Sequence, residues 1–116
     1  MAVRSGAFSW MNSASATASS AVAQSRQAFA NIAAILTAAG ATPANLVRLT
    51  WFITDRDAYL RERAAIGAAY REVLGRHFPA MSVVVIAGLL EPGAEVEIEA
   101  TAVLPSESGP SPSTGA

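Results

Sequence analysis

The residues best suited to chemistry in this chain are three acids, Glu95, Glu97 and Glu99, which alternate with apolar residues near the C-terminus. Side chains at every second position of a β-strand project from the same face, so this spacing places the three carboxylates in one row. A carboxylate in a pocket can orient a water molecule and act as its general base. The same row is also typical of a solvated or subunit-facing strand, and the spacing alone leaves both interpretations open.

The chain lacks the residues that several common kinds of catalytic site require. It has no cysteine, its eight cations are all arginine, and His77 is its single histidine. A thiolate nucleophile, a Schiff-base lysine and a metal site with several histidines are therefore excluded. Chemistry in this protein must rely on carboxylate, hydroxyl, guanidinium or backbone groups. His77 follows a predicted helix, where we expect it to cap the helix or to face solvent.

Length and composition predict a single domain with no membrane segment. The 116 residues are 52% hydrophobic and 15% charged, with a net charge of −1. No apolar run approaches the roughly 20 residues that cross a bilayer, and the N-terminal segment lacks the pattern of a secretory signal. The absence of cysteine favours the cytoplasm. Because phosphate contacts need clustered cations, we expect neither a nucleic acid nor a membrane as partner.

Hydrophobic periodicity predicts an α+β fold. Apolar positions spaced by three and four residues indicate helices over 20–39 and 55–75, while strands are indicated over 46–54, 81–89 and 94–104 and near the N-terminus. This order predicts two helices packed on one face of a mixed sheet. The folded domain is predicted to cover 1–104, and residues 105–116, rich in Pro, Ser and Gly, are predicted to be a disordered tail.

The same pattern assigns the faces of these elements. On the first long strand, the inward residues are predicted to be Val47, Leu49, Trp51 and Ile53. The second helix is predicted to bury Leu60, Ile66, Tyr70, Val73 and Leu74 and to present Arg61, Arg63, Arg71 and Arg76 to solvent. The other sheet face combines the Glu row with Arg48, Thr50, Ser82, Phe52 and Val84. A face that is polar and apolar at once predicts a subunit interface, and hence a homo-oligomer.

Three short motifs resemble the RidA/YjgF family of imine and enamine deaminases. They are A-Q-S-R-Q at residues 23–27, F-P-A-M-S at 78–82 and V-E-I-E-A at 96–100, in the order and at the spacing of the family. The resemblance covers about residues 5–104 and implies a chorismate-mutase-like fold, assembled as a homotrimer with a pocket at each subunit interface. It also implies hydrolysis of 2-imino acids or their enamine tautomers to 2-oxo acids and ammonia, without a metal or organic cofactor.

The resemblance assigns roles to five residues. Glu97 matches the family's glutamate that positions the attacking water. Ser82, with the backbone that follows at Val83, matches a segment that lines the pocket. Gly6 stands where the family has a turn beside the pocket, and Trp10 is close enough to that turn to contact a ligand. Glu97 is the predicted catalytic residue, and the predicted substrate-binding set is Gly6, Trp10, Met81, Ser82 and Val83.

Position 81 is the main departure from the family. The family has an arginine there that clamps the substrate carboxylate, whereas this chain has Met81. A guanidinium grips a carboxylate through two parallel hydrogen bonds that a thioether cannot replace, so Met81 suits a less polar ligand. Gly67 stands where the family often has an asparagine. The family's first strand and most of its second would precede Met1, so we expect a truncated chain or a misplaced start.

The sequence leaves two main functions open. One is a hydrolase that deaminates small reactive imines or enamines and so removes damaging metabolites, with typical 2-imino acids disfavoured by Met81. The other is a non-catalytic protein that binds a small metabolite or a partner on the same trimeric scaffold. An endoribonuclease activity, ascribed to some members of the family, ranks third because the chain has no basic groove.

Overall fold

The computed structural model describes residues 6–13 and 20–104, with side chains described from residue 20 onward. In chain order the elements are β1 (Gly6–Ser13), α1 (Ala21–Ala38), the 3-10 turn η1 (Pro43–Asn45), β2 (Leu46–Ile53), α2 (Arg56–Leu74), β3 (Ala80–Val85) and β4 (Val96–Leu104). The predicted elements are present, although β3 is shorter than expected. The predicted disordered tail at 105–116 lies outside the described residues.

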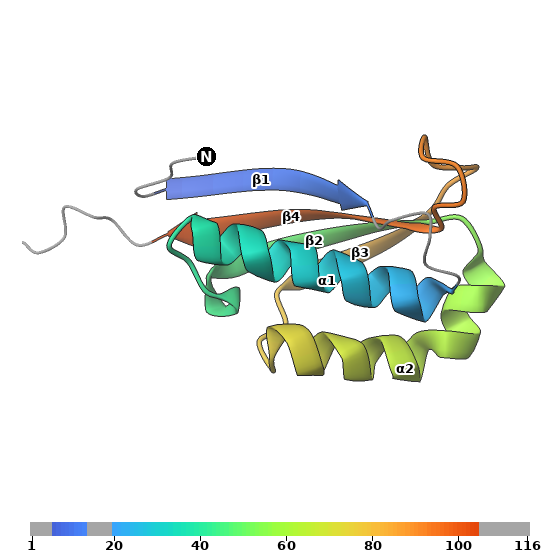
Figure 1. The fold of residues 1–116 in the computed structure, drawn as a ribbon, viewed down its shortest axis with the longest axis horizontal. Coiled ribbons are helices and arrows are strands. Elements are labelled where there is room, and N and C mark those ends of the chain that lie inside the picture. The colour runs from blue at the N-terminus through green and yellow to red at the C-terminus, as the bar shows by residue number, and fades with distance from the viewer. Residues whose placement is uncertain (1–5, 14–19, 105–116) are drawn as a thin grey trace, which may run out of the picture.

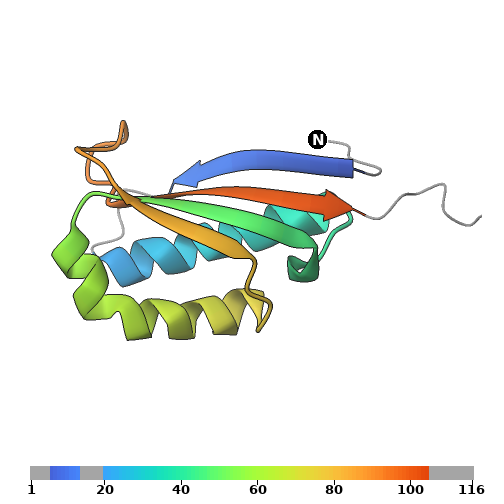
Figure 2. The same ribbon diagram turned by 180° about the vertical axis from the view of Figure 1, so that it is seen from behind.

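The four strands form one mixed sheet in the order β1-β4-β2-β3. β4 is antiparallel to β1 and β2, while β3 pairs parallel with β2. A parallel pair needs a long connection that carries the chain back to the same end of the sheet, and α2 supplies it. Figures 1 and 2 show from opposite sides that both helices lie on one face of the sheet. The predicted layer of two helices on one face of a mixed sheet is confirmed.

Local interactions set the ends of the helices. The Ser20 hydroxyl accepts a hydrogen bond from the Ala23 backbone N–H at 3.1 Å, and Asp55 Oδ1 accepts one from the Ala58 N–H at 3.0 Å. Gly75 follows α2 with a φ of 84°, a region that glycine enters at little steric cost. Both ends of α2 are therefore where the sequence predicts them, and they determine which residues of the helix lie over the sheet.

Three aromatic rings join the two helices to the sheet. Phe29 of α1 packs edge-on against Trp51 of β2, with ring centroids 5.4 Å apart, and against Tyr70 of α2 at 5.3 Å. All three rings are buried in the core. Such edge-to-face pairs contribute about 0.5–1.5 kcal/mol each beyond the burial of apolar area. The core therefore holds the Trp51 indole in one place between sheet and helices.

Two of the predicted inward positions are wrong. Val47 exposes 46% of its surface and Leu46 is buried instead, because a register irregularity between Leu46 and Arg48 shifts the alternation at the start of β2. Leu60 of α2 is 43% exposed. The helix buries the smaller Ala58 in its first turns, so the inward face there is rotated away from Leu60.

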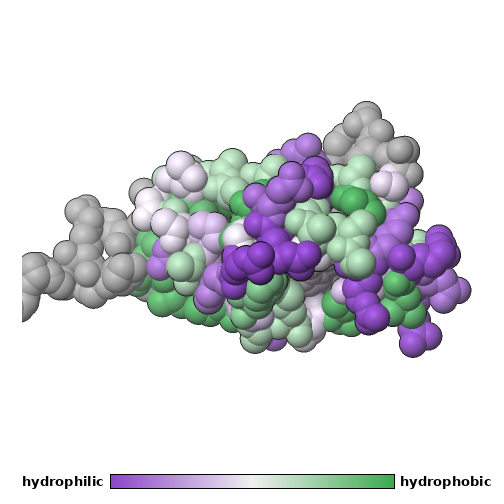
Figure 3. Space-filling model, turned by 90° about the horizontal axis from the view of Figure 1, so that it is seen from below, coloured by the Kyte–Doolittle hydropathy of each residue, from purple (hydrophilic) through white to green (hydrophobic). Residues whose placement is uncertain are grey.

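The outer surface of the helix layer faces the viewer in Figure 3. Strongly hydrophilic side chains gather at the end where α2 begins and across the middle of this surface. One ion pair on the helices joins Arg26 of α1 to Glu72 of α2 at 3.0 Å. Both partners are largely exposed, so the pair contributes at most about 1 kcal/mol. The aromatic core, rather than surface charge, holds the layers together.

Candidate ligand-binding site

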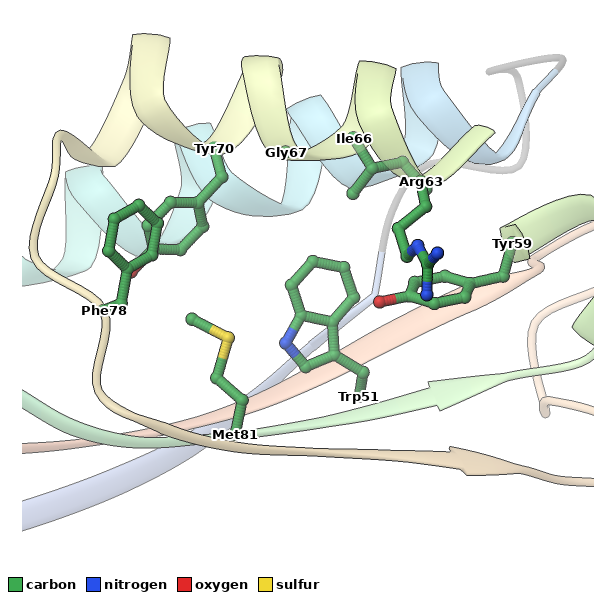
Figure 4. Close-up of a pocket in the computed structure, with 8 residues that line it drawn as sticks. All are labelled: Trp51, Tyr59, Arg63, Ile66, Gly67, Tyr70, Phe78 and Met81. Carbon is green, nitrogen blue, oxygen red and sulfur yellow. The ribbon is translucent and has the colours of Figure 1, made fainter. Parts of the chain in front are cut away.

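A cavity of about 140 Å³ lies between α2 and the parallel strands β2 and β3 (Figure 4). Its lining residues come from these three elements and from the segment that joins α2 to β3: Trp51, Tyr59, Arg63, Ile66, Gly67, Tyr70, Phe78 and Met81. Most of these side chains are aromatic or aliphatic. The arrangement therefore resembles a small-molecule site, with apolar walls and few polar groups.

One face of α2 forms the helical wall of the cavity. Tyr59, Arg63, Ile66 and Tyr70 succeed one another at intervals of four, three and four residues. This spacing aligns side chains along one side of a helix. The same stripe that buries Ile66 and Tyr70 in the core therefore carries Tyr59 and Arg63 into the cavity.

Strand register determines the wall on the sheet side. In the parallel ladder Leu49 pairs with Met81 and Trp51 pairs with Val83. Residues in register on neighbouring strands point to the same side of the sheet, and Leu49 and Trp51 are buried under the helices. Met81 and Val83 therefore face the helices, while Ser82 faces the opposite side.

Met81 and Gly67, two of the residues at which the chain departs from the family pattern, line this one cavity. Met81 points from β3 toward α2 and keeps 40% of its surface exposed (Figure 4). A Cβ added to Gly67 would meet only a guanidinium nitrogen of Arg71, at 3.6 Å, so close packing does not demand glycine at this position. Met81 brings an apolar side chain and Gly67 leaves open space. The two residues together make the cavity less polar and roomier.

Two polar groups in the cavity have no protein partner within the described residues. The indole nitrogen of Trp51 is buried and makes no hydrogen bond to any described residue. The edge of the indole that carries this nitrogen faces Met81 (Figure 4). Arg63 is exposed on the cavity wall and forms no ion pair with any acid of residues 20–104. The cavity therefore offers these two groups, together with the Tyr59 hydroxyl, to a ligand.

Tyr70 belongs to the frame of the cavity and is not poised for acid–base chemistry. Its hydroxyl donates to the His77 carbonyl at 2.7 Å, and burial raises the pKa of Tyr70 to about 12. The Phe78 ring stacks on Tyr70 with centroids 5.2 Å apart. His77 Nε2 in turn is 2.7 Å from the Leu46 carbonyl, so His77 ties this segment to the start of β2. These contacts fix the connection from α2 to β3.

Glu97 lies on the other face of the sheet, as the alternation in β4 predicts. It is half-buried and pairs across the antiparallel ladder with Phe52, which in turn pairs with Val84 of β3. A row of Val84, Phe52 and Glu97 therefore crosses the open face. Met81 faces the helices, so one copy of the chain does not bring Glu97 and Met81 together.

The A-Q-S-R-Q motif anchors the start of the strand that carries Glu97. Gln24 is buried in α1, where its Nε2 donates to the Gly93 carbonyl at 3.0 Å and its Oε1 accepts from the Glu95 N–H at 2.7 Å. A buried amide with both ends bonded fixes its neighbours firmly. Gln24 therefore positions the turn before β4, two residues from Glu97.

Gly6 and Trp10 lie on β1, at the opposite edge of the sheet from β3. Gly6 begins this strand rather than occupying a turn, and it pairs with Leu104, while Trp10 pairs with Ala100. The predicted substrate-binding residues are thus divided between the two edges of one sheet. Only contacts between copies of the chain could bring the two edges into one pocket.

Arg63 is a site residue that the sequence pattern misses. The prediction that Arg63 is exposed on the surface of the helix is confirmed, and the structure adds that this exposed side chain also lines the cavity. The available signal is its position seven residues before Tyr70, two turns along the buried stripe. The surrounding alternation of arginine and glutamate, which is typical of an exposed helix, conceals that signal.

In the described part of the chain, no group of three or more histidines, aspartates and glutamates is arranged to hold a metal ion. The helices of the same residues also include none with both the length and the apolarity to cross a membrane. The polar groups available in the cavity are Trp51 Nε1, Arg63 and the Tyr59 hydroxyl.

A protein-family model described as Endoribonuclease L-PSP matches residues 1–104. The chain belongs to the RidA/YjgF family. The match covers all three motifs on which the resemblance rests, and it confirms that resemblance.

Two relatives illustrate how close this family member is to characterised proteins. It is 37% identical over 91 residues to the 2-iminobutanoate/2-iminopropanoate deaminase of Salmonella typhimurium, an alignment covering 76% of this chain and 67% of that protein. It is 38% identical over 82 residues to a RutC family protein of Haemophilus influenzae, covering 71% of this chain and 62% of that protein. This family member therefore spans about two thirds of the length of these curated relatives.

Solved structures of other members share the fold. A YjgF-family protein from Mycobacterium tuberculosis superposes with a TM-score of 0.72 at 32% identity, covering 86% of this chain and 80% of that one. A Rid-family protein from Yersinia pestis gives a TM-score of 0.71 at 30% identity with the same coverage. The predicted RidA-like fold is therefore confirmed, while the trimeric assembly stays a prediction.

Proposed function

We propose that this family member is a cytoplasmic, cofactor-free hydrolase that deaminates small reactive imines or enamines and releases ammonia. The observation that carries the proposal is Glu97, a half-buried carboxylate on the open face of the sheet, in the E-I-E element of the family. Relatives from Salmonella typhimurium and Escherichia coli that are named 2-iminobutanoate/2-iminopropanoate deaminase support the reaction class. The ligand is a small metabolite, and neither a nucleic acid nor a membrane is needed.

The reaction requires only water and a base. Glu97 orients a water molecule and accepts one of its protons as the water oxygen attacks the carbon of the C=N bond. The imine nitrogen takes up a proton, and a tetrahedral amino alcohol forms. The hydroxyl proton then passes to the amino nitrogen as the C–N bond breaks, which releases ammonia and leaves a carbonyl. One water is consumed for each ammonia formed, and backbone N–H groups can stabilise the charge that develops on oxygen.

The proposal includes a homotrimer with pockets between the copies. One chain places Glu97 and Met81 on opposite faces of the sheet. β3 is an edge strand that is exposed at all six positions, including three consecutive valines. An exposed apolar edge of this kind is normally covered in the native assembly. A second copy against β3 would cover it and bring the residues of both faces into one pocket.

Light scattering on the purified chain tests the assembly. We expect a single species with three times the mass of one chain. A uniform monomer at micromolar concentration would contradict the inter-subunit pocket and with it the proposed reaction.

Ammonia release from freshly generated imines tests the chemistry. Replacing the base by an amide of the same shape, Glu97→Gln, is expected to lower the rate roughly 10²- to 10⁴-fold. The matched control is Glu99→Gln, two residues further along the same face of β4, which should stay close to wild type. Equal losses in the two variants, or no turnover of any imine by the assembled wild type, would contradict the proposal.

Met81→Arg tests the proposed substrate range. A guanidinium at position 81 would supply the carboxylate grip that this chain lacks. We expect kcat/KM for small 2-imino acids to rise roughly ten- to a hundredfold, with little change for neutral imines. A wild-type chain that already turns over small 2-imino acids efficiently, and gains nothing from Met81→Arg, would show that Met81 does not limit the substrate range.

A second candidate function is non-catalytic binding of a small ligand. The observation in its favour is the separation of the two features: the cavity at Met81 lies on the helix side, away from Glu97. Binding there needs no catalytic carboxylate. Saturable binding of a ligand combined with no ammonia release from any imine would favour this alternative.

A further inference from the structure

The helix-side cavity has the size and the walls of a site for one aromatic ring. It measures about 140 Å³, and an engineered cavity of about 150 Å³ in another protein binds benzene. On one side the Tyr70 and Phe78 rings stack at an interplanar angle of 23°, and Trp51 stands on the other side (Figure 4). Gly67 of α2 also lines the cavity and adds no side chain to fill the space below the helix. A flat apolar group therefore matches this space.

Trp51 places a buried hydrogen-bond donor at the wall of this cavity. Only 4% of its surface is exposed, and its Nε1 has no acceptor within the described residues. Phe29 packs edge-on against the indole at 5.4 Å and Tyr59 at 6.2 Å, so the ring is held in place and cannot turn to find an acceptor in solvent. An indole N–H donates and does not accept, and buried donors are nearly always paired. The missing partner is therefore an acceptor from outside the described residues.

Met81 lies where that acceptor would enter. It faces the edge of the indole that carries the nitrogen (Figure 4), and 40% of its surface is exposed. Its thioether sulfur is a weak acceptor, and no hydrogen bond joins it to the indole. The unbranched side chain has three rotatable bonds, so it can swing toward solvent at little cost. A ligand can therefore replace a poor neighbour of the indole nitrogen with a good acceptor.

The surroundings of the indole nitrogen favour an uncharged acceptor. Arg63 lies with Tyr59 on the other side of the indole from Met81 (Figure 4), so its charge is directed away from the nitrogen. The Tyr70 hydroxyl is already committed, because it donates to the His77 carbonyl at 2.7 Å. A carboxylate beside the nitrogen would give up its hydration for one neutral donor, which is strongly unfavourable, whereas a single neutral acceptor would be fully satisfied.

We infer that the helix-side cavity binds an uncharged aromatic molecule that carries one hydrogen-bond acceptor, such as a ketone or aldehyde oxygen. Trp51 Nε1 donates to the acceptor, the ring lies below Gly67 beside Tyr70, and Met81 moves aside to admit the ligand. Trp51 is thus the residue that selects the ligand. The inference goes beyond the proposed function and does not depend on it, because binding here requires neither Glu97 nor turnover.

Acetophenone is a suitable probe because it combines one ring with one neutral acceptor. Two comparison compounds of similar size each change one feature: ethylbenzene has no acceptor, and benzoate has a carboxylate in place of the ketone. Titration calorimetry on the assembled full-length chain compares acetophenone with benzoate. We expect acetophenone to bind at least about tenfold more tightly, because the site would have to strip the carboxylate of its water.

Nuclear magnetic resonance tests the hydrogen bond directly. The chain has two tryptophans, and Trp51→Phe identifies the indole N–H resonance of Trp51. We expect acetophenone to shift this resonance downfield, because a hydrogen bond forms at the nitrogen, and we expect ethylbenzene to leave it close to its position in the free protein. The methyl resonance of Met81 should move with acetophenone as its side chain leaves the indole edge.

A pair of leucine variants tests the place of the ring. Gly67→Leu puts a side chain into the space below the helix and is expected to weaken acetophenone binding at least about tenfold. Ala68→Leu changes the next residue, which is exposed and outside the cavity lining, and should alter the affinity less than about twofold. Leucine is a good helix former, so both variants should remain folded, and thermal denaturation checks this.

Four results would overturn the inference. They are no detectable binding of acetophenone, equal shifts of the Trp51 indole resonance by acetophenone and ethylbenzene, equal effects of the two leucine variants, and tighter binding of benzoate that Arg63→Gln abolishes. The last would show that the charge of Arg63 selects the ligand instead. Ammonia release that requires Glu97, without binding of acetophenone, would remove the inference and leave the deaminase. Binding of acetophenone without ammonia release from any imine would do the reverse.

Discussion

On the helix-covered face of the sheet, Trp51 and Met81 border a cavity that has α2 as its opposite wall. On the open face, Glu97 lies in a row with Phe52 and Val84, and no described helix covers this row. The first environment is formed by residues of one chain, because the crossover helix packs directly onto the two strands it connects. Within the described residues, no helix covers the second environment. Folding of one chain is therefore enough to form the cavity, whereas the proposed inter-subunit pocket at Glu97 would need a second copy of the chain.

The two faces are expected to differ most in how much a packed side chain contributes to the free energy of unfolding. Phe29→Ala removes the ring that contacts both Trp51 and Tyr70 and should lower the free energy of unfolding by roughly 3–5 kcal/mol. Phe52→Ala, on the half-exposed open face, should cost about 1 kcal/mol in the dissociated chain. Urea denaturation at low protein concentration measures both. Equal costs would show that the open face is packed as tightly as the helix side.

The second-largest effect is the pH dependence that Tyr70, on the helix side of the sheet, gives to the free energy of unfolding. The pKa of Tyr70 rises from 10.0 to about 12 on folding, so the unfolded chain gives up this proton first. The stabilisation is present in full below pH 10 and is lost as pH rises through about 12. It amounts to ~2–3 kcal/mol, because each unit of difference between the folded and unfolded pKa corresponds to about 1.4 kcal/mol. Denaturation curves between pH 8 and 12 should show this decline.

Two tyrosine variants separate this effect from general alkaline instability. Tyr70→Phe should remove the decline, although it also removes the hydrogen bond to the His77 carbonyl and costs about 1 kcal/mol at neutral pH. Tyr59→Phe changes the other tyrosine and should keep the decline. An unchanged slope in Tyr70→Phe would rule out Tyr70 as its source.

A smaller loss of stability is expected when Gln24 of α1 is removed, because this residue joins the helix layer to the turn before β4. Gln24→Ala leaves the Gly93 carbonyl and the Glu95 N–H without their partner and should cost about 2 kcal/mol. Gln27→Ala removes an exposed side chain bonded to Asn31 and should cost less than about 0.5 kcal/mol. Amide hydrogen exchange at Glu95 should accelerate only in the first variant. Equal protection in both would show that the turn before β4 is held by other contacts.

The smallest effect concerns two glycines of the cavity helix. Gly67→Ala should raise the free energy of unfolding by about 0.5–1 kcal/mol, because alanine favours a helix interior and the added Cβ meets only a flexible arginine nitrogen. Gly75→Ala should lower it by a similar amount, because its φ of 84° strains any other residue. Thermal denaturation compares them. A destabilised Gly67→Ala would show that the open space beside Gly67 is required for packing.

Features set by local interactions could be predicted from the sequence. Asp55 caps α2 and Gly75 ends it, because both act on backbone groups a few residues away. The alternation over 96–104 places Glu97 on the open face, because β4 is regular throughout its length. The family motifs likewise lie in segments whose order along the chain is sufficient for recognition.

Features set by contacts between elements could not be predicted. The register of β3 with β2 confirms the predicted placement of Ser82 on the face away from the helices, but alternation within β3 does not predict that Met81 borders a cavity under α2. The exposure of Val47 follows from an irregularity in strand pairing that leaves no sign in its own composition. Arg63 enters the cavity because of how α2 lies on β3, while its neighbours in sequence suggest only a charged helix face.

All eight residues that line the cavity fall between Trp51 and Met81, a single stretch made of one strand, the crossover helix and the strand that follows. Glu97 belongs to a later segment and to the other face. Substitutions that change the size or charge of the cavity can therefore accumulate in one contiguous stretch of the gene without altering the strand that carries Glu97. A lineage with this arrangement can reshape the cavity while β4 stays the same.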